Sequence, residues 1–247
     1  MRTVQFIGVP AQPIPGAVDA VVVALKSRTA PSVEAVPRSL AALEWLTAAE
    51  TRQFFFKYCQ TFDSTDAGNI APVADALLDA LNTGFTVFCP ALPENGRTVY
   101  LGHLFVGDAL LSDSGMRDHP LTPMRDPSLR RVLSRRTKHK IGPVPLMAVS
   151  RGVAAVRAEL ARLRRVGCSH AIPDAVRDED FRRAGLLGIA QRVDSLPPAP
   201  GAAVVISGSC SAATLAQVAA MRRTNPVFDL DVLALAAGAP VVARSFD

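Results

Sequence analysis

Short apolar runs rich in β-branched and aromatic residues alternate along this chain with segments whose apolar residues recur at helical spacing. The strand-like runs are Val4 to Val9, Ala20 to Leu25, Gln53 to Cys59, Phe85 to Cys89 and Ala203 to Ile206. The helix-like segments are residues 40–49, 71–81 and 153–166, with Pro72 suited to a first helical turn and Gly84 and Gly167 placed where helices end. Strands alternating with helices predict an α/β fold with a parallel sheet.

A proline- and glycine-rich stretch, Leu196 to Gly201, interrupts this pattern and is typical of a linker. We therefore predict a first domain over residues 1–195, a linker over 196–202 and the beginning of a second α/β domain over 203–247. At 247 residues and 49% hydrophobic content, the chain is long and apolar enough to bury a sizeable core.

The net charge of +5 and the sequence pI near 9.4 raise the question of nucleic-acid binding. No aromatic stacking platform accompanies the basic residues, of which six lie in one short stretch, so we interpret them as solvated helix faces and expect no nucleic-acid partner. The six basic residues of this short stretch are Arg130, Arg131, Arg135, Arg136, Lys138 and Lys140.

No apolar run reaches the ~18 residues that a membrane span needs, and no signal-type segment opens the chain. We expect a cytoplasmic protein.

Three polar, glycine-containing segments follow one another in an informative order. They are KYCQTFDSTDAGNIAPVADALL at 57–78, CPALPENGRTVYLGHLFVGDALLSDSGMRDHPLTP at 89–123 and VVISGSCSAATLAQVA at 204–219. In these segments, and above all in the strings PENGR and GHLFVGD, the chain resembles the four-carbon acid sugar kinases, in particular the 3-oxo-tetronate kinase branch. The resemblance extends from the opening strand to about Ala219.

The resemblance implies a three-layer, mostly parallel, Rossmann-like sugar-binding domain followed by the start of a nucleotide-binding domain. It implies that ATP, with Mg²⁺, phosphorylates the terminal hydroxyl of a 3-oxo-tetronate to give the 4-phosphate. A serine of the Ser-Gly-Ser-Cys-Ser turn, among Ser207, Ser209 and Ser211, would contact ATP. The implied partners are an acid sugar and ATP, and a homo-oligomer is compatible with the sequence. No histidine or carboxylate spacing is typical of a protein-held metal.

Ligands of open α/β sheets bind beyond the carboxyl ends of the strands, where several polar residues of this chain fall. Lys26 and Arg28 follow the second strand, Lys57 to Thr65 close and follow the third, and Pro93 to Arg97 follow the fourth. An acid sugar needs a cation for its carboxylate, which Arg97 or Arg28 can bind with a bidentate fork. The predicted substrate-binding residues are Lys26, Arg28, Lys57, Ser64, Asn95, Arg97 and His103, and Asp63 is the catalytic candidate.

Each of these residues also has a purely structural interpretation. Asp63 precedes a helical segment and could cap it. Asn95-Gly96 is a strong turn signal that could only reverse the chain. His103 flanks the apolar run Leu104 to Val106 and could be a hydrogen-bonded core histidine.

A second activity is open at Cys210, which lies at a predicted strand-to-helix turn where a thiol could act as the nucleophile of a hydrolase. Ala212 replaces the glycine usual after the nucleophile in that elbow, and no histidine follows Cys210 in the chain. The same turn could instead bind phosphate through backbone N–H groups at a helix start, which the resemblance favours.

Members of the resembled family open with an Asp-Asp-Phe-Thr-Gly-Ala turn and carry a late glycine-rich phosphate loop, neither of which occurs in this sequence. A non-catalytic sugar-acid-binding fragment is therefore the alternative to a kinase. We predict little or no turnover by this chain alone, because phosphoryl transfer requires sugar, nucleotide and metal to be held in line. ADP release with ATP, magnesium and four-carbon sugar acids within tenfold of a full-length relative would contradict this expectation.

Overall fold

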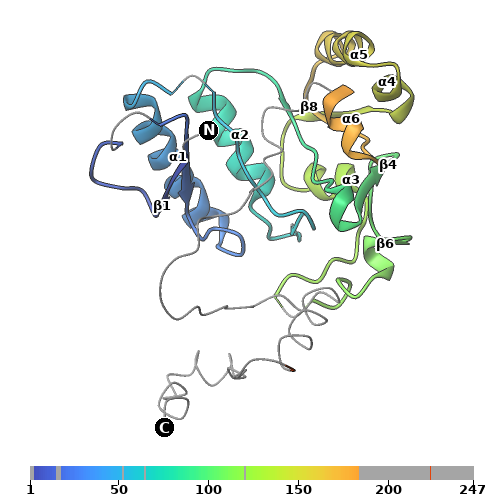
Figure 1. Cartoon of the computed structure of the whole chain (residues 1–247), viewed down its shortest axis with the longest axis horizontal. Helices are drawn as coiled ribbons and strands as arrows, with labels where there is room; N and C mark the ends of the chain where they lie inside the picture. Colours follow the sequence, from blue (N-terminus) through green and yellow to red (C-terminus); the bar gives the residue numbers. More distant parts are fainter. Residues whose placement is uncertain are drawn as a thin grey trace. The chain divides into compact units, whose positions relative to one another are not determined.

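The structure contains both strands and helices, as the apolar pattern predicts, but two helices follow one another at α1–α2 and a run of strands extends from β3 to β6 (Figure 1). The structure is a computed structural model that describes residues 3–183, apart from 15–17, 52, 64 and 120, together with residue 223. All of these except Arg223 belong to one unit, Met1–Asp194. The predicted linker and, apart from Arg223, the predicted second domain lie outside the described residues. No helix in the described part is long and apolar enough to cross a membrane.

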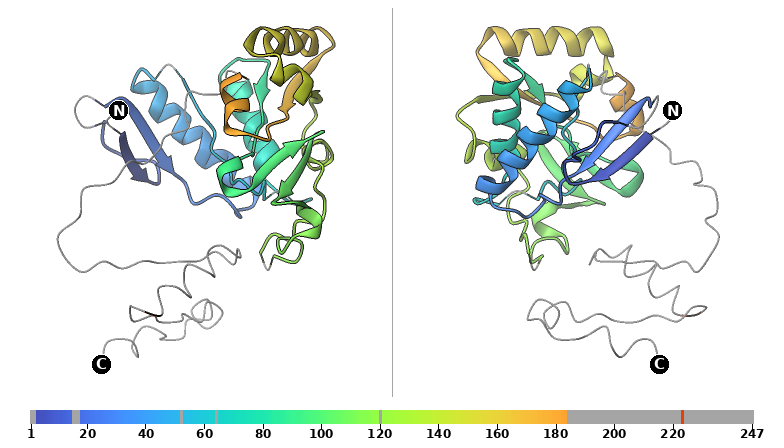
Figure 2. Two further views of the ribbon diagram at one scale, coloured as in Figure 1. Left: turned by 45° about the vertical axis from the view of Figure 1, so that its right-hand side comes forward. Right: turned by 90° about the vertical axis from the view of Figure 1, so that its left-hand side faces the viewer.

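The first half of the described chain contains two strands and the two helices that follow them. Phe6 of β1 makes an edge-to-face ring contact with Trp45 of α1, so this helix covers one face of the β1–β2 pair (Figure 2). The elements are β1 (Thr3–Ile7), β2 (Ala20–Ala24), α1 (Ser32–Ala48) and α2 (Ile70–Ala80). The helical spacing at 40–49 and 71–81 is thus confirmed, with α1 starting eight residues before its predicted range.

The second half adds further strands and helices, among which the strands form two small sheets. They are β3 (Thr86–Val87), β4 (Arg97–Tyr100), β5 (His103–Val106), β6 (Ala109–Leu110), α3 (Leu129–Ser134), β7 (Lys140–Val144), α4 (Leu146–Ser150), α5 (Val153–Arg165), β8 (Cys168–Pro173) and α6 (Asp178–Arg183). Two 3₁₀ turns, Pro93–Asn95 and Leu111–Asp113, lie between them. The helix predicted at 153–166 is confirmed as α5, and the strand predicted at 85–89 is reduced to β3.

The expected single parallel sheet is replaced, within the described residues, by three small sheets. β1 pairs with β2 in parallel, and a second parallel sheet has the order β3-β8-β7. The strands β4, β5 and β6 form an antiparallel meander. Leu101 and Gly102 both have positive φ, of 50° and 70°, which is the geometry of a tight two-residue hairpin turn. The fold is therefore a mixed α/β fold, in which two of the three sheets are parallel.

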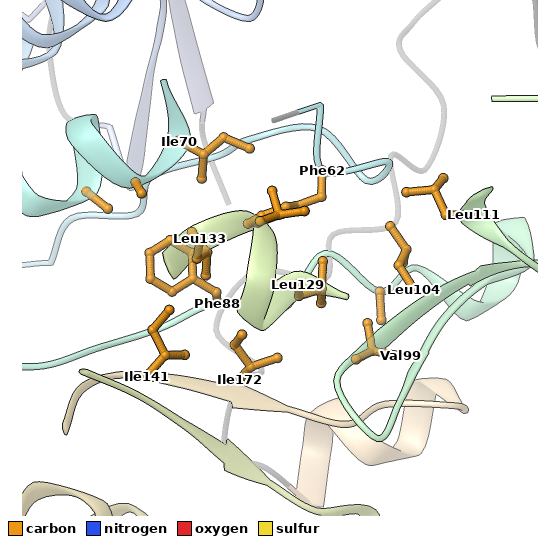
Figure 3. Close-up of a cluster of buried hydrophobic side chains, with 14 of the residues drawn as sticks. Phe62, Ile70, Phe88, Val99, Leu104, Leu111, Leu129, Leu133, Ile141 and Ile172 are labelled. Atoms are coloured by element: carbon orange, nitrogen blue, oxygen red, sulfur yellow. The ribbon is translucent and has the colours of Figure 1, made fainter. Parts of the chain in front are cut away.

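Residues Gln53 to Cys59 do not form the predicted strand but run as an irregular segment. Their aromatic side chains anchor the segment instead of alternating along a sheet, because Tyr58 makes edge-to-face contacts with both Phe56 and Phe62. Phe62 and Phe88 lie in the main core with Leu129 and Leu133 of α3 (Figure 3). Aromatic and β-branched composition alone therefore gave a wrong prediction here.

A second, smaller core lies between α5 and the β7–β8 pair. A Cβ atom at Gly142 would stand only 2.3 Å from Cδ2 of Leu163, so the absence of a side chain at this position of β7 lets the helix pack closely.

The Tyr58 hydroxyl accepts a hydrogen bond of 2.7 Å from the backbone N–H of Cys89, just after β3. Replacing Tyr58 with Phe should lower the free energy of unfolding by ~1–3 kcal/mol, because a buried N–H group loses its acceptor. Tyr100→Phe is the matched control, since Tyr100 is exposed. Equal urea midpoints for the two variants would show that this hydrogen bond does not hold the segment.

Candidate functional site

An ion pair joins two of the predicted site residues that come from different loops. The Nε of Arg28, which follows β2, donates to Oδ2 of Asp63, which lies before α2. The Asp63 side chain is 1% exposed and that of Arg28 is 58% exposed. Burial alone would lower the pKa of Arg28, but the hydrogen bond and charge of Asp63 raise it above its ordinary value. The guanidinium is therefore firmly cationic and partly open to solvent.

A tight turn over Cys59 to Asp63 directs this carboxylate inward. The backbone N–H of Asp63 donates to Sγ of Cys59 at 2.9 Å, and the Thr61 hydroxyl donates to Asp63 Oδ1 at 2.6 Å. Phe62 has a φ of 51°, a left-handed conformation that is costly for a bulky residue, and its ring is 2% exposed. Burial of the ring stabilises the strained backbone. Asp63 does not cap α2, whose N-cap residue is Asn69, so the capping interpretation of Asp63 is wrong.

Cys59 is close to the carboxylate but is not poised as a nucleophile. Burial, with the nearby charge of Asp63, raises the pKa of its thiol above the ordinary value. Arg28 Nη2 also donates a hydrogen bond of 3.3 Å to the hydroxyl oxygen of Thr61. Neither Cys59 nor Thr61 was predicted as a site residue, although both lie within the same polar segment.

Arg97, at the start of β4, is half-buried and makes no ion pair with any other residue of the described chain. Its Nη1 donates to the carbonyl of Asn95 at 3.0 Å, while its buried Nε has no hydrogen-bond partner. Burial lowers the pKa of this guanidinium. Asn95 closes a 3₁₀ turn, and the following Gly96 has a φ of 65°, so the turn interpretation of Asn95-Gly96 is confirmed. The structure brings Asn95 and Arg97 together in one turn.

His103 does not share the face of the meander that carries Arg97. Arg97 lies on the same face as the fully buried Val99, whereas His103 pairs with Tyr100 on the other face. The His103 ring also bonds the carbonyl of Leu101 through Nδ1 at 2.9 Å. This contact makes His103 a hydrogen-bonded histidine of the hairpin turn rather than a core histidine, since its ring is not fully buried.

The remaining predicted site residues are either exposed or outside the described part of the chain. Lys26 and Lys57 are exposed, and Lys57 Nζ donates to the carbonyl of Tyr58. Lys26 has a φ of 51° beside Arg28. Outside the described residues lie Ser64, Ser207, Ser209, Ser211 and Cys210.

The basic stretch around α3 is largely paired within the molecule. Arg135 joins Asp126 at 2.9 Å and Asp66 at 3.0 Å, and Arg131 joins Asp126 at 2.8 Å. Burial would raise the pKa of Asp126, yet the hydrogen bonds from Arg131 and the Ser128 N–H hold it below its ordinary value. Further contacts run from Arg136 to Ser32, from Lys138 to Asp79 and from Lys140 to the Val166 carbonyl. These cations tie α3 and β7 to neighbouring segments.

A buried histidine in the core was not predicted from the sequence. His170 of β8 is fully buried, and its Nε2 lies 2.8 Å from Asp75 Oδ1 and 3.2 Å from the Thr137 hydroxyl. A Ser/Thr-His-Asp triad needs the acid and the hydroxyl on opposite ring nitrogens, so this cluster is structural. Within the described residues, no group of three or more His, Cys, Asp or Glu side chains is placed to hold a metal ion.

Comparison with known proteins identifies the family to which this chain is similar. A family described as "Sugar-binding N-terminal domain" matches residues 1–215. The chain is 55% identical to a 3-oxo-tetronate kinase of Burkholderia multivorans and covers 64% of that protein, and it is 52% identical to one of Cupriavidus necator and covers 63% of it. The first alignment runs over 272 residues, more than the 247 of this chain, so that relative carries additional residues within the matched stretch.

A solved structure supports the same assignment at the level of the fold. A Haemophilus influenzae protein, 44% identical in sequence, superposes with a TM-score of 0.74, and the match covers 94% of this chain and 62% of that one. The family match covers well over half of this chain, and the similarity extends to nearly its full length. The chain therefore belongs to the family of the 3-oxo-tetronate kinases and carries that family's sugar-binding N-terminal domain.

Proposed function

We propose that this chain binds the acid-sugar substrate of an ATP-dependent kinase that phosphorylates a four-carbon acid sugar, 3-oxo-tetronate, to the 4-phosphate. The chain spans about 64% of the length of the curated relatives that it matches, so the activity of the whole protein enters here as a proposal. The relatives named 3-oxo-tetronate kinase and the description of the matching family support it.

The observation that carries the proposal is the incomplete use of the Arg28 guanidinium. Its Nε and Nη2 contact Asp63 and Thr61, while Nη1 has no hydrogen-bond partner among the described residues. A guanidinium offers five N–H donors in a planar fork that suits a carboxylate. With its inner edge fixed by a buried acid and its outer edge open to solvent, Arg28 is arranged to bind an anionic ligand.

Asp63 is the aspartate that we propose for the site, and its surroundings favour a role in orienting Arg28 over proton abstraction from the sugar. Oδ2 accepts from Arg28 and Oδ1 accepts from Thr61, so both carboxylate oxygens are engaged. Arg97 is the second proposed contact of the acid sugar, because an arginine with a buried, unpartnered Nε gains most from a carboxylate.

ATP use follows from the kinase relatives, and we propose that Ser207, Ser209 and Ser211 contribute to the nucleotide site. Mg²⁺ would arrive with the nucleotide, because divalent cations bridge the nucleotide phosphates in phosphoryl transfer. Phosphoryl transfer depends on positioning and charge neutralisation, which a fixed cation supplies to the sugar acid.

The test of Arg28 is the variant Arg28→Ala, compared with Arg38→Ala. Arg38 is a similarly exposed arginine of α1 that pairs with Glu34 at 2.8 Å. Removing a charge-assisted contact should weaken binding of erythronate or threonate by ~1.5–3 kcal/mol, roughly tenfold or more. Isothermal titration calorimetry measures the affinities. Equal affinities for the two variants would remove Arg28 from the site.

Arg97→Ala should also weaken binding of these acids by roughly tenfold or more, because the carboxylate would lose a partly desolvated arginine. Arg157→Ala, an exposed arginine of α5, serves as the control and should bind as the parent does. A neutral four-carbon polyol, erythritol, should bind the parent and Arg97→Ala equally. Loss of acid binding only with Arg28→Ala would place Arg97 outside the substrate contacts.

A further inference from the structure

The loop between β2 and α1 carries Arg28, and the side chain of Asn69 fixes this loop by hydrogen bonds. The side-chain nitrogen of Asn69 donates to the carbonyl of Ser27 at 2.7 Å and to the carbonyl of Ala30 at 2.8 Å. Both hydrogens of this amide nitrogen are therefore used. The two carbonyls bracket Arg28 in the sequence, and Asn69 is only 5% exposed.

This use of Asn69 is not the one that its position predicts. Asn69 is the N-cap residue of α2, where an asparagine side chain ordinarily accepts a hydrogen bond from the helix's own N–H groups. In this structure it makes no side-chain capping bond. The helix thus forgoes a cap worth ~1 kcal/mol while the side chain reaches a loop some 40 residues earlier in the chain.

The backbone of this loop contains a strained residue and a long hydrogen bond, so contacts from outside the loop are needed to stabilise it. Lys26 adopts a left-handed conformation, with a φ of 51°, which is uncommon for residues other than glycine. The N–H of Ala30 closes a turn onto the carbonyl of Ser27 at 3.2 Å, at the long end of hydrogen-bond distances. Strained backbone of this kind persists when its surroundings over-determine it.

The same segment of chain contains both Asn69, which fixes the loop, and Asp63, the acid that pairs with Arg28. Asp63 and Asn69 lie six residues apart before α2, so the backbone of the loop and the guanidinium of Arg28 are fixed against one short stretch. A loop held at only one of these points could rotate Arg28 away from the acid.

We propose that Asn69 is a positioning residue for the acid-sugar site: its amide fixes residues 27–30 so that Arg28 meets Asp63 and presents its free N–H groups to the substrate carboxylate. Asn69 does not itself contact the sugar. The identity of the ligand rests on the proposed function, whereas the fixing of the loop does not.

The experiment compares Asn69→Ser with Asn82→Ser in the full chain. Serine is a good N-cap residue but cannot reach both carbonyls, and Asn82 lies exposed just after α2. Trypsin cleavage after Lys26 and after Arg28, followed by mass spectrometry, reports the loop without any ligand. Asn69→Ser should be cut at these two bonds roughly tenfold faster than the parent, since two partly buried hydrogen bonds are lost, and Asn82→Ser should be cut at the parental rate. Unchanged cleavage in Asn69→Ser overturns the proposal.

The second arm tests whether Asn69 acts through Arg28. Asn69→Ser should weaken erythronate or threonate binding roughly tenfold in the parent and have no further effect in an Arg28→Ala background. Losses that add in the double variant would mean that Asn69 acts independently of Arg28 and would overturn the positioning role. If the parent binds neither acid, the proposed function fails, while the cleavage rates still decide whether Asn69 fixes the loop. Should Asn69→Ser fold poorly, Asn69→Asp keeps the shape and the capping oxygen and removes both donors, with the same expected results.

Discussion

Burial of the Phe62 ring links the core of this protein to its candidate site. The ring packs against Tyr58 and Phe88, and this packing holds the backbone of Phe62 in a left-handed conformation. The strained turn sends the next side chain, that of Asp63, inward to meet Arg28. An irregular segment therefore positions the acid, because aromatic side chains rather than a hydrogen-bonded ladder hold it in place.

The distribution of charge follows from the same arrangement. Several cations of the basic stretch around α3 pair with nearby acids, and Arg135 joins both Asp66 and Asp126. Arg28 differs in that its acidic partner is buried and its outer edge is open, and Arg97 differs in having no acidic partner among the described residues. A net positive charge therefore says little about partners, whereas an arginine with unused donors beside a buried acid is the feature on which the proposed anion site rests.

The proposed acid-sugar site around Arg28 and Asp63 is consistent with membership of this chain in the 3-oxo-tetronate kinase family. Within the segment from Cys59 to Asn69, Cys59 and Thr61 contact the acid Asp63, and Asn69 fixes the loop opposite. We infer that such a site binds its ligand through pre-organised groups rather than through groups that become ordered on binding. The cost of holding strained backbone is offset by the buried aromatic rings on the other side of the turn.

The sequence by itself determined the three long helices, the first two strands and the turn at Gly96, because periodic apolar spacing and glycine conformations act over a few residues. It also predicted that Arg28 and Asp63 lie close together, which their ion pair confirms, although the predicted strand at 53–59 that led to this expectation does not form. Tertiary structure alone decided that the sheet is divided, that residues 53–59 are irregular and that Asn69 grips a loop instead of capping its helix. The sequence separations explain the difference: Arg28 and Asp63 are 35 residues apart, Ser27 and Asn69 are 42, and Ser32 and Arg136 are 104. Local patterns carry no information about which of several competent polar partners a folded chain brings together across such distances.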